Sequence, residues 1–136
     1  MNLKNYAGTL VFIVSITLAG CNRSAAQNGS ESEMDNPPVI IEMTQLRFEP
    51  QSVTVPVNGT VKWINTSGTN HTVTADSSLA DDPSNVVLPD GAEPFNSNTL
   101  EPDEEFEYSF TVPGRYRYFC IPHEHLGMIG EVIVEP

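Results

Sequence analysis

Short apolar runs separated by turn residues make up the chain from residue 39 to its end, and these runs lack a helical period. They are rich in β-branched and aromatic residues, and proline, asparagine and glycine lie between them. The runs cover residues 39–43, 46–48, 52–57, 60–65 and 129–136. Many short strands at this spacing predict an all-β sandwich or barrel of about 100 residues.

Strict alternation of apolar and polar residues predicts two further strands, at residues 105–110 and 114–120. Their inward faces hold Phe106, Tyr108, Phe110, Tyr116, Tyr118 and Cys120. Phe119 falls on the opposite face and is expected to point outward. The Val-Pro-Gly loop between the two segments predicts a hairpin that keeps the aromatic faces together, and Asn58-Gly59 predicts a second hairpin turn.

Residues 76–103 follow neither pattern. The segment is long, acidic and poorly periodic, and its only obvious apolar anchors are residues 86–88 and Phe95. The hydrophobic pattern therefore predicts no structure for it.

The N-terminus has the layout of a secretory signal, with Lys4 before an apolar run over residues 7–18 that is too short for a span of about 20 residues. The run ends in Leu-Ala-Gly-Cys, which resembles the bacterial lipobox, and that resemblance implies lipidation of Cys21 after cleavage. We expect three parts: a lipoprotein signal peptide at 1–20, the lipidated cysteine with a flexible tether at 21–38, and a folded domain at 39–136. The protein would be exported and lipid-anchored to a membrane, facing the periplasm or the cell exterior.

Acidic residues dominate the charge, with 18 Asp and Glu against 6 Lys and Arg and a formal net charge of −12. This balance excludes a nucleic-acid binder, because phosphate attraction needs positive charge. No Lys or Arg lies between Lys62 and Arg115, whereas ten acidic residues lie there. Two interpretations stay open: a solvated surface that keeps the protein soluble, or steering of a basic redox partner.

The two cysteines point to metal chemistry. If Cys21 carries lipid, Cys120 has no disulfide partner in a compartment where disulfides form. Cys120 shares one loop with His123 and Met128, and His71 lies in another loop. A trigonal site of two histidines and one cysteine, with a weak axial thioether, is typical of blue-copper electron-transfer centres.

Two stretches of the chain resemble the cupredoxin family. Residues 116–134, YRYFCIPHEHLGMIGEVIV, are similar to its C-terminal ligand loop, with the C-x₂-H-x₄-M spacing of plastocyanin-like members. Residues 61–75 are similar to its first histidine loop. The resemblance implies a Greek-key β-sandwich with the copper site between loops at one end. The implied ligands of one copper ion, cycling between Cu(I) and Cu(II), are His71, Cys120, His123 and Met128.

The same resemblance implies roles for neighbouring residues. His123 would be the electron-transfer port, surrounded by Ile121, Pro122, Leu126 and Gly127. Thr72 stands where plastocyanins usually have an asparagine that ties the ligand loops together, and its hydroxyl could serve in that place. Phe119 replaces a surface tyrosine that is implied in a second electron path. His125 could in principle replace His123 as a ligand, but the loop spacing favours His125 as a solvent-facing neighbour.

A one-electron carrier is therefore the predicted function, and a copper-binding protein for storage or delivery is the alternative. An enzyme is not expected, because multicopper oxidases and nitrite reductases need further histidine-rich sites and only His125 is left over. The expected partners are redox proteins, basic and of cytochrome or oxidase type, together with the membrane through the lipid anchor. We expect a monomer.

Overall fold

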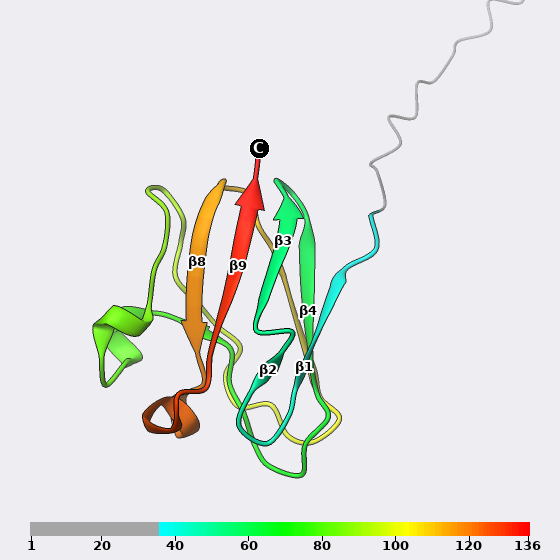
Figure 1. The fold of residues 1–136 in the computed structure, drawn as a ribbon, viewed down its shortest axis with the longest axis vertical. Coiled ribbons are helices and arrows are strands. Elements are labelled where there is room, and N and C mark those ends of the chain that lie inside the picture. Colours follow the sequence, from blue (N-terminus) through cyan, green and yellow to red (C-terminus); the bar gives the residue numbers. More distant parts are fainter. Residues whose placement is uncertain (1–35) are drawn as a thin grey trace, which may run out of the picture. The chain divides into compact units, whose positions relative to one another are not determined.

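Two β-sheets pack face to face in the computed structural model, which describes residues 36–136 (Figure 1). The first sheet has the strand order β2-β1-β4-β7, and the second has the order β3-β9-β8-β5-β6. The strands are β1 (Val39–Met43), β2 (Phe48–Glu49), β3 (Ser52–Pro56), β4 (Thr60–Asn65), β5 (Thr74–Ala75), β6 (Phe95–Asn96), β7 (Glu105–Ser109), β8 (Gly114–Phe119) and β9 (Ile129–Glu135). This arrangement confirms the predicted all-β sandwich.

Three short 3₁₀ helices complete the described elements: η1 (Ser77–Leu79), η2 (Pro83–Asn85) and η3 (Ile121–Leu126). Among residues 36–136 no helix has the length and apolar character needed to cross a membrane. The predicted signal peptide, Cys21 and most of the predicted tether lie outside the described residues.

The two predicted hairpins are wrong, although the Asn58-Gly59 turn itself forms. Asn58 has a φ of 66°, and the Gly59 amide donates to the Pro56 carbonyl at 2.8 Å, but the strands that they join, β3 and β4, belong to different sheets. β7 and β8 likewise lie in different sheets. The two connections between the sheets are hydrogen-bonded to each other. The Asn58 amide donates to the Phe110 carbonyl at 2.7 Å, and the Phe110 amide donates to the Gly59 carbonyl at 3.0 Å.

The predicted contact between the aromatic faces nevertheless forms, because those faces oppose each other across the core. Phe110 and Tyr116 meet edge to face with ring centroids 4.8 Å apart. Trp63 and Tyr118 are both fully buried, and the Trp63 indole N–H donates to the Tyr118 hydroxyl at 3.0 Å. This bond satisfies two polar groups that would be costly to bury alone. The aromatic core thereby joins the two sheets beneath the loops that follow β4 and β8.

Residues 76–103 form a surface segment with η1, η2 and the short strand β6. Phe95 on β6 enters the core, and Val87 forms an antiparallel bridge with Arg117 of β8. The same segment packs against β8 through η2. Phe119 was expected to point outward, but it is fully buried.

Candidate metal centre

Three side chains from two loops converge at one end of the sandwich: His71, Cys120 and His123. Their ligand atoms all lie within 4.8 Å of one another. The Cys120 Sγ is 3.4 Å from the His71 Nδ1 and 3.4 Å from the His123 Nδ1. Metal bonds of about 2.0–2.3 Å to imidazole and thiolate leave nitrogen and sulfur about 3–4 Å apart, so this spacing fits one ion bonded to all three.

Strand pairing places the cysteine. Cys120 follows directly on β8, whose last residue, Phe119, pairs with Ile129 on β9. The pairing continues past the strand end, because the Cys120 amide donates to the Met128 carbonyl at 3.1 Å. Residues 120–128, called the ligand loop here, thus begin and end side by side. Met128 is fully buried in the same core cluster as Cys120.

The ligand loop has its own internal hydrogen bonds. The His123 amide donates to the Cys120 carbonyl at 3.0 Å, and the Met128 amide donates to the His123 carbonyl at 3.2 Å. His123 interrupts η3 with φ of −124° and ψ of 17°. Gly127 ends the helix with φ of 78°, a conformation that favours glycine. The loop therefore has a defined shape around His123.

A polar cradle holds the His71 ring. Its Nε2 lies 2.9 Å from the Ser67 hydroxyl and 3.2 Å from the Thr69 hydroxyl. Buried Asn65 supports both, because its Oδ1 accepts from Ser67 Oγ at 2.8 Å and its Nδ2 donates to the Thr69 carbonyl at 2.8 Å. The His71 backbone pairs with Leu100 through two hydrogen bonds of 3.0 and 2.8 Å. With Nε2 protonated, the ring donates to the cradle and turns its Nδ1 lone pair toward the sulfur.

Thr72 connects the two ligand-bearing loops. Its hydroxyl accepts from the Ile121 amide at 2.8 Å, and its own amide donates to the Cys120 sulfur at 3.4 Å. Thr74 orients that hydroxyl by donating to it at 3.0 Å. Thr72 therefore fixes the first residue after the cysteine and places a hydrogen-bond donor on the sulfur.

Burial disfavours the charged forms of His71 and Cys120 in the metal-free site. It lowers the pKa of His71 to about 4, and a charge on the neighbouring His123 acts in the same direction. Burial also raises the pKa of the Cys120 thiol, against the opposing effect of its N–H donors. A bound cation reverses the balance at the sulfur, because a metal-bound thiol loses its proton. The site thus combines the neutral imidazole of His71, which ligates directly, with a buried thiol that a metal deprotonates.

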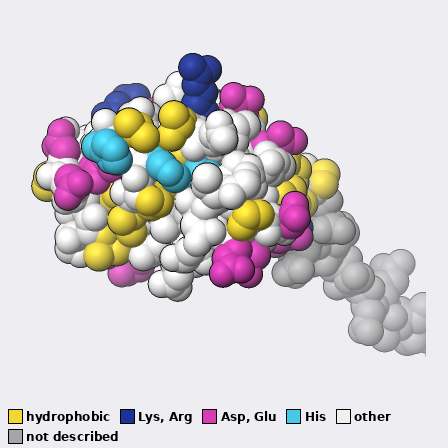
Figure 2. Space-filling model, turned by 90° about the horizontal axis from the view of Figure 1, so that it is seen from below, with side chains coloured by type: hydrophobic (Ala, Val, Ile, Leu, Met, Phe, Trp, Pro, Cys, Tyr) yellow, Lys and Arg dark blue, Asp and Glu magenta, His cyan; other side chains and the backbone are white. Residues whose placement is uncertain are grey.

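Hydrophobic side chains surround the histidines on the face that Figure 2 shows. His123 is half-buried, whereas His125 is exposed. Ile121 and Leu126 are exposed over 38% and 53% of their surfaces, and Pro122 and Gly127 are exposed as well. The structure therefore directs the His123 ring toward Cys120 beneath an apolar rim. His125 is not among the three residues whose ligand atoms converge.

A soft thiolate with two imidazoles suits copper, and a buried set of this composition is the blue-copper arrangement. The model for copper binding proteins of the plastocyanin/azurin family matches residues 35–135. The chain belongs to this family. Its cofactor is one copper ion, and it is an electron-transfer protein of the cupredoxin type with a His-Cys-His site.

Three relatives show how far the likeness extends. A plastocyanin from Scenedesmus fuscus is 33% identical over 90 residues, which cover 66% of this chain and 88% of the relative. The structure of a Cu(I) form of an amicyanin mutant is 26% identical, with a TM-score of 0.57 and coverage of 72% and 82%. A copper-containing nitrite reductase from Thermus scotoductus is 25% identical with a TM-score of 0.57, over 74% of this chain but 23% of the enzyme.

Sequence reasoning named the converging residues and Thr72 but missed the other side chains that support them. Asn65, Ser67 and Thr69 carry the His71 ring, and Glu124 is a buried carboxylate inside the ligand loop. The sequence did carry a signal for the supports of His71, because residues 65–70, directly before it, include no apolar side chain. Glu124 carried no such signal, because its partners lie about 40 residues away in the chain.

Removing the cradle hydroxyls should weaken copper binding. We expect Ser67→Ala combined with Thr69→Val to lower copper affinity by about 10- to 100-fold, because the imidazole loses the acceptors that orient it. Competition with a chelator of known affinity measures the change. Ser77→Ala, on the exposed surface of η1, is the control and should bind as the wild type does. Unchanged affinity in the double variant would show that the ring needs no support from these hydroxyls.

Proposed function

We propose that the protein is a one-electron carrier whose copper is held by His71, Cys120 and His123, with Met128 as a weak axial ligand. The observation that carries this proposal is the buried Cys120 sulfur with an imidazole Nδ1 at 3.4 Å on each side. Bound copper supplies the Cu(II)/Cu(I) couple. The chain's own residues hold the ligands, exclude water and set the hydrogen bonds to the sulfur.

A rigid site suits this task, since a transferred electron should cause little rearrangement. The Thr72 amide directed at the sulfur and the cradle beneath His71 are formed within the protein itself. Burial of Met128 beside the end of β8 supports its assignment as the axial ligand. A storage or delivery protein would instead need an exchangeable ion, and a buried Cys120 and His71 argue against easy exchange.

The port for electrons is His123, in our proposal, with Ile121, Pro122, Leu126 and Gly127 as its rim. His123 is half-buried, and all four rim residues are exposed. An imidazole edge amid apolar side chains lets a partner approach closely without strong ionic contacts to break afterwards. Thr72 supports the port from within by fixing the Ile121 amide.

The optical and EPR spectra of the purified Cu(II) protein test the ligand assignment. We expect an intense visible thiolate-to-copper band that is lost in Cys120→Ser, His71→Ala and His123→Ala and survives in His125→Ala. Met128→Leu should keep the band but shift the midpoint potential, because the axial thioether tunes it. A pale spectrum with exchangeable copper in the wild type would support storage or delivery and remove the electron-carrier proposal.

Acidic surface charge supports a basic redox partner as the physiological one. Nine acidic residues between 81 and 107 are exposed, and Lys62 on β4 pairs with two of them, Glu105 and Glu107. The nine are Asp81, Asp82, Asp90, Glu93, Glu101, Asp103, Glu104, Glu105 and Glu107. This charge would raise the encounter rate with a basic cytochrome or oxidase.

Stopped-flow transfer to a basic cytochrome should therefore slow with salt. We expect the second-order rate constant to fall about tenfold or more between low ionic strength and about 0.5 M salt, where charges more than a few ångströms apart are screened. Asp90→Asn with Glu93→Gln should lower the low-salt rate and flatten the salt dependence. A rate constant that does not change with salt concentration would mean that the acidic surface serves only to keep the protein soluble.

A lipid anchor at Cys21 would hold the carrier at an extracytoplasmic membrane face, with residues 22–38 as the tether. The lipobox-like sequence supports this part of the proposal. In the native host, Cys21→Ser should move the protein from the membrane fraction to the soluble fraction, whereas Cys120→Ser should stay with the membrane. Membrane recovery of both variants would mean that the cysteine is not the anchor.

A further inference from the structure

Glu124 carries a buried carboxylate in the middle of the ligand loop. Its residue is 6% exposed and lies between His123 and the exposed His125. A buried carboxylate is costly unless it is paired or fully hydrogen-bonded. Glu124 is not one of the proposed copper ligands.

Three N–H donors surround the Glu124 carboxylate, and all come from one distant stretch of chain. Oε2 accepts from the Asp81 amide at 2.8 Å. Oε1 accepts from the Asp82 amide at 3.1 Å and from the Asn85 side-chain amide at 2.8 Å. Charge-assisted bonds of this kind are stronger than neutral ones. The carboxylate therefore fastens the ligand loop to residues 81–85.

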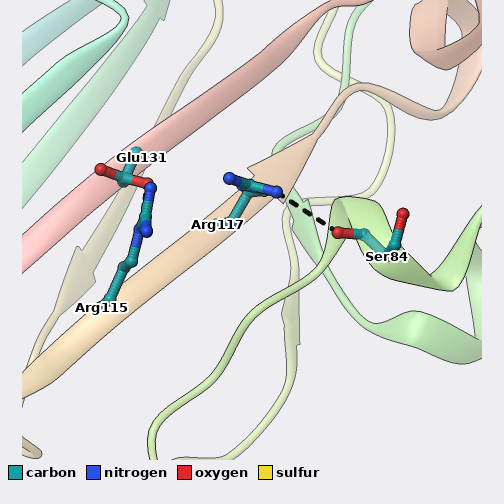
Figure 3. A network of polar contacts seen from close by, with 4 residues as sticks. All are labelled: Ser84, Arg115, Arg117 and Glu131. Carbon is teal, nitrogen blue, oxygen red and sulfur yellow. Dashed lines mark hydrogen bonds and ion pairs between the residues drawn. The ribbon is translucent and has the colours of Figure 1, made fainter.

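Residues 81–85 are themselves held against β8. Next to them, Val87 and Arg117 exchange two backbone hydrogen bonds of 2.9 and 3.3 Å. Figure 3 shows the Arg117 side chain reaching the Ser84 carbonyl, at 3.5 Å, while Arg115 on the same strand pairs with Glu131. Glu124 is thus attached to a segment that a central strand supports, and not to a free surface loop.

The ligand loop is consequently held at two points. Thr72 next to β5 binds the Ile121 amide, and Glu124 binds residues 81–85. His123 lies between Ile121 and Glu124, and its backbone departs from helical geometry. Fixing the residues on each side of His123 leaves its ring little freedom to move.

We propose that Glu124 is a positioning residue: its carboxylate ties the ligand loop to residues 81–85 and so holds His123 in place as a ligand. This proposal rests on the proposed function, because it assigns His123 to copper. Without the tie, the loop would keep its attachment at Thr72 and to β9 but would gain mobility around His123. Copper would then meet a less preorganised site.

Glu124→Gln is the sharpest variant, because it keeps size and shape. A glutamine oxygen can still accept from Asp82 and Asn85, but its NH₂ group then faces the Asp81 N–H, donor against donor. Asp81→Asn is the matched control: Asp81 contributes its backbone N–H to the contact, so this change alters the charge and keeps the tie. Asn85→Ala removes one donor from the opposite side and serves if Glu124→Gln fails to fold.

Hydrogen exchange of the metal-free protein tests the attachment. We expect Glu124→Gln to speed exchange about tenfold or more in residues 81–85 and 121–127, with strands β4 and β9 unchanged. Asp81→Asn should match the wild type, and Asn85→Ala should show a smaller increase in the same segments. Wild-type exchange in both Glu124→Gln and Asn85→Ala would overturn the tie.

The copper form tests the positioning. We expect Glu124→Gln to alter the Cu(II) EPR parameters and lower copper affinity by about tenfold or more, with neither change in Asp81→Asn. Faster exchange with an unaltered spectrum and affinity would overturn the proposal, since Glu124 would then hold the surface segment alone. A wild type without the thiolate band would overturn the proposed function together with the copper role, while the exchange data would still decide whether the tie exists.

Discussion

The antiparallel pairing of Thr74 with Phe119 is the contact on which the metal site depends. One step further along this register Val73 stands opposite Cys120, and His71, two residues before Val73, therefore lies at the same end of the sheet as Cys120. The pairing of Phe119 with Ile129 does the same for Cys120 and Met128. Strand pairing therefore brings His71 to Cys120, 49 positions away in the chain, before any side chain binds a metal.

Beyond the last ladder pair, side chains replace backbone hydrogen bonds. The Thr72 hydroxyl accepts the Ile121 amide where a neighbouring strand would have offered a carbonyl. Asn65 makes three side-chain hydrogen bonds to Ser67 and Thr69 before His71 and a fourth to the Leu100 carbonyl. Glu124 accepts three hydrogen bonds from residues 81–85. These side-chain hydrogen bonds let the strands separate enough to enclose an ion. Within residues 36–136, every buried side-chain nitrogen or oxygen has a hydrogen-bond partner.

The sequence predicted what depends on local pattern. Alternation placed Tyr116, Tyr118 and Cys120 on an inward face, and the strand bounds at 60–65 agree with β4. The Asn58-Gly59 turn was also visible, but a turn sequence does not say whether its strands pair with each other or enter opposite sheets. That choice depends on partners elsewhere, because β3 pairs with β9 and β4 pairs with β1 and β7.

Long-range partners also explain why the sequence predicted neither the structure of residues 76–103 nor the burial of Phe119. The segment has little apolar periodicity because much of it is held by hydrogen bonds, to Glu124 and to Arg117, and not by a buried stripe. Phe119 alternates outward as the pattern requires, yet it is fully buried. The two sides of Cys120 are thereby made unequal: the Phe119 side is closed by protein, whereas His123 is half-exposed beneath an apolar rim. A partner that binds this end of the sandwich meets the imidazole side first.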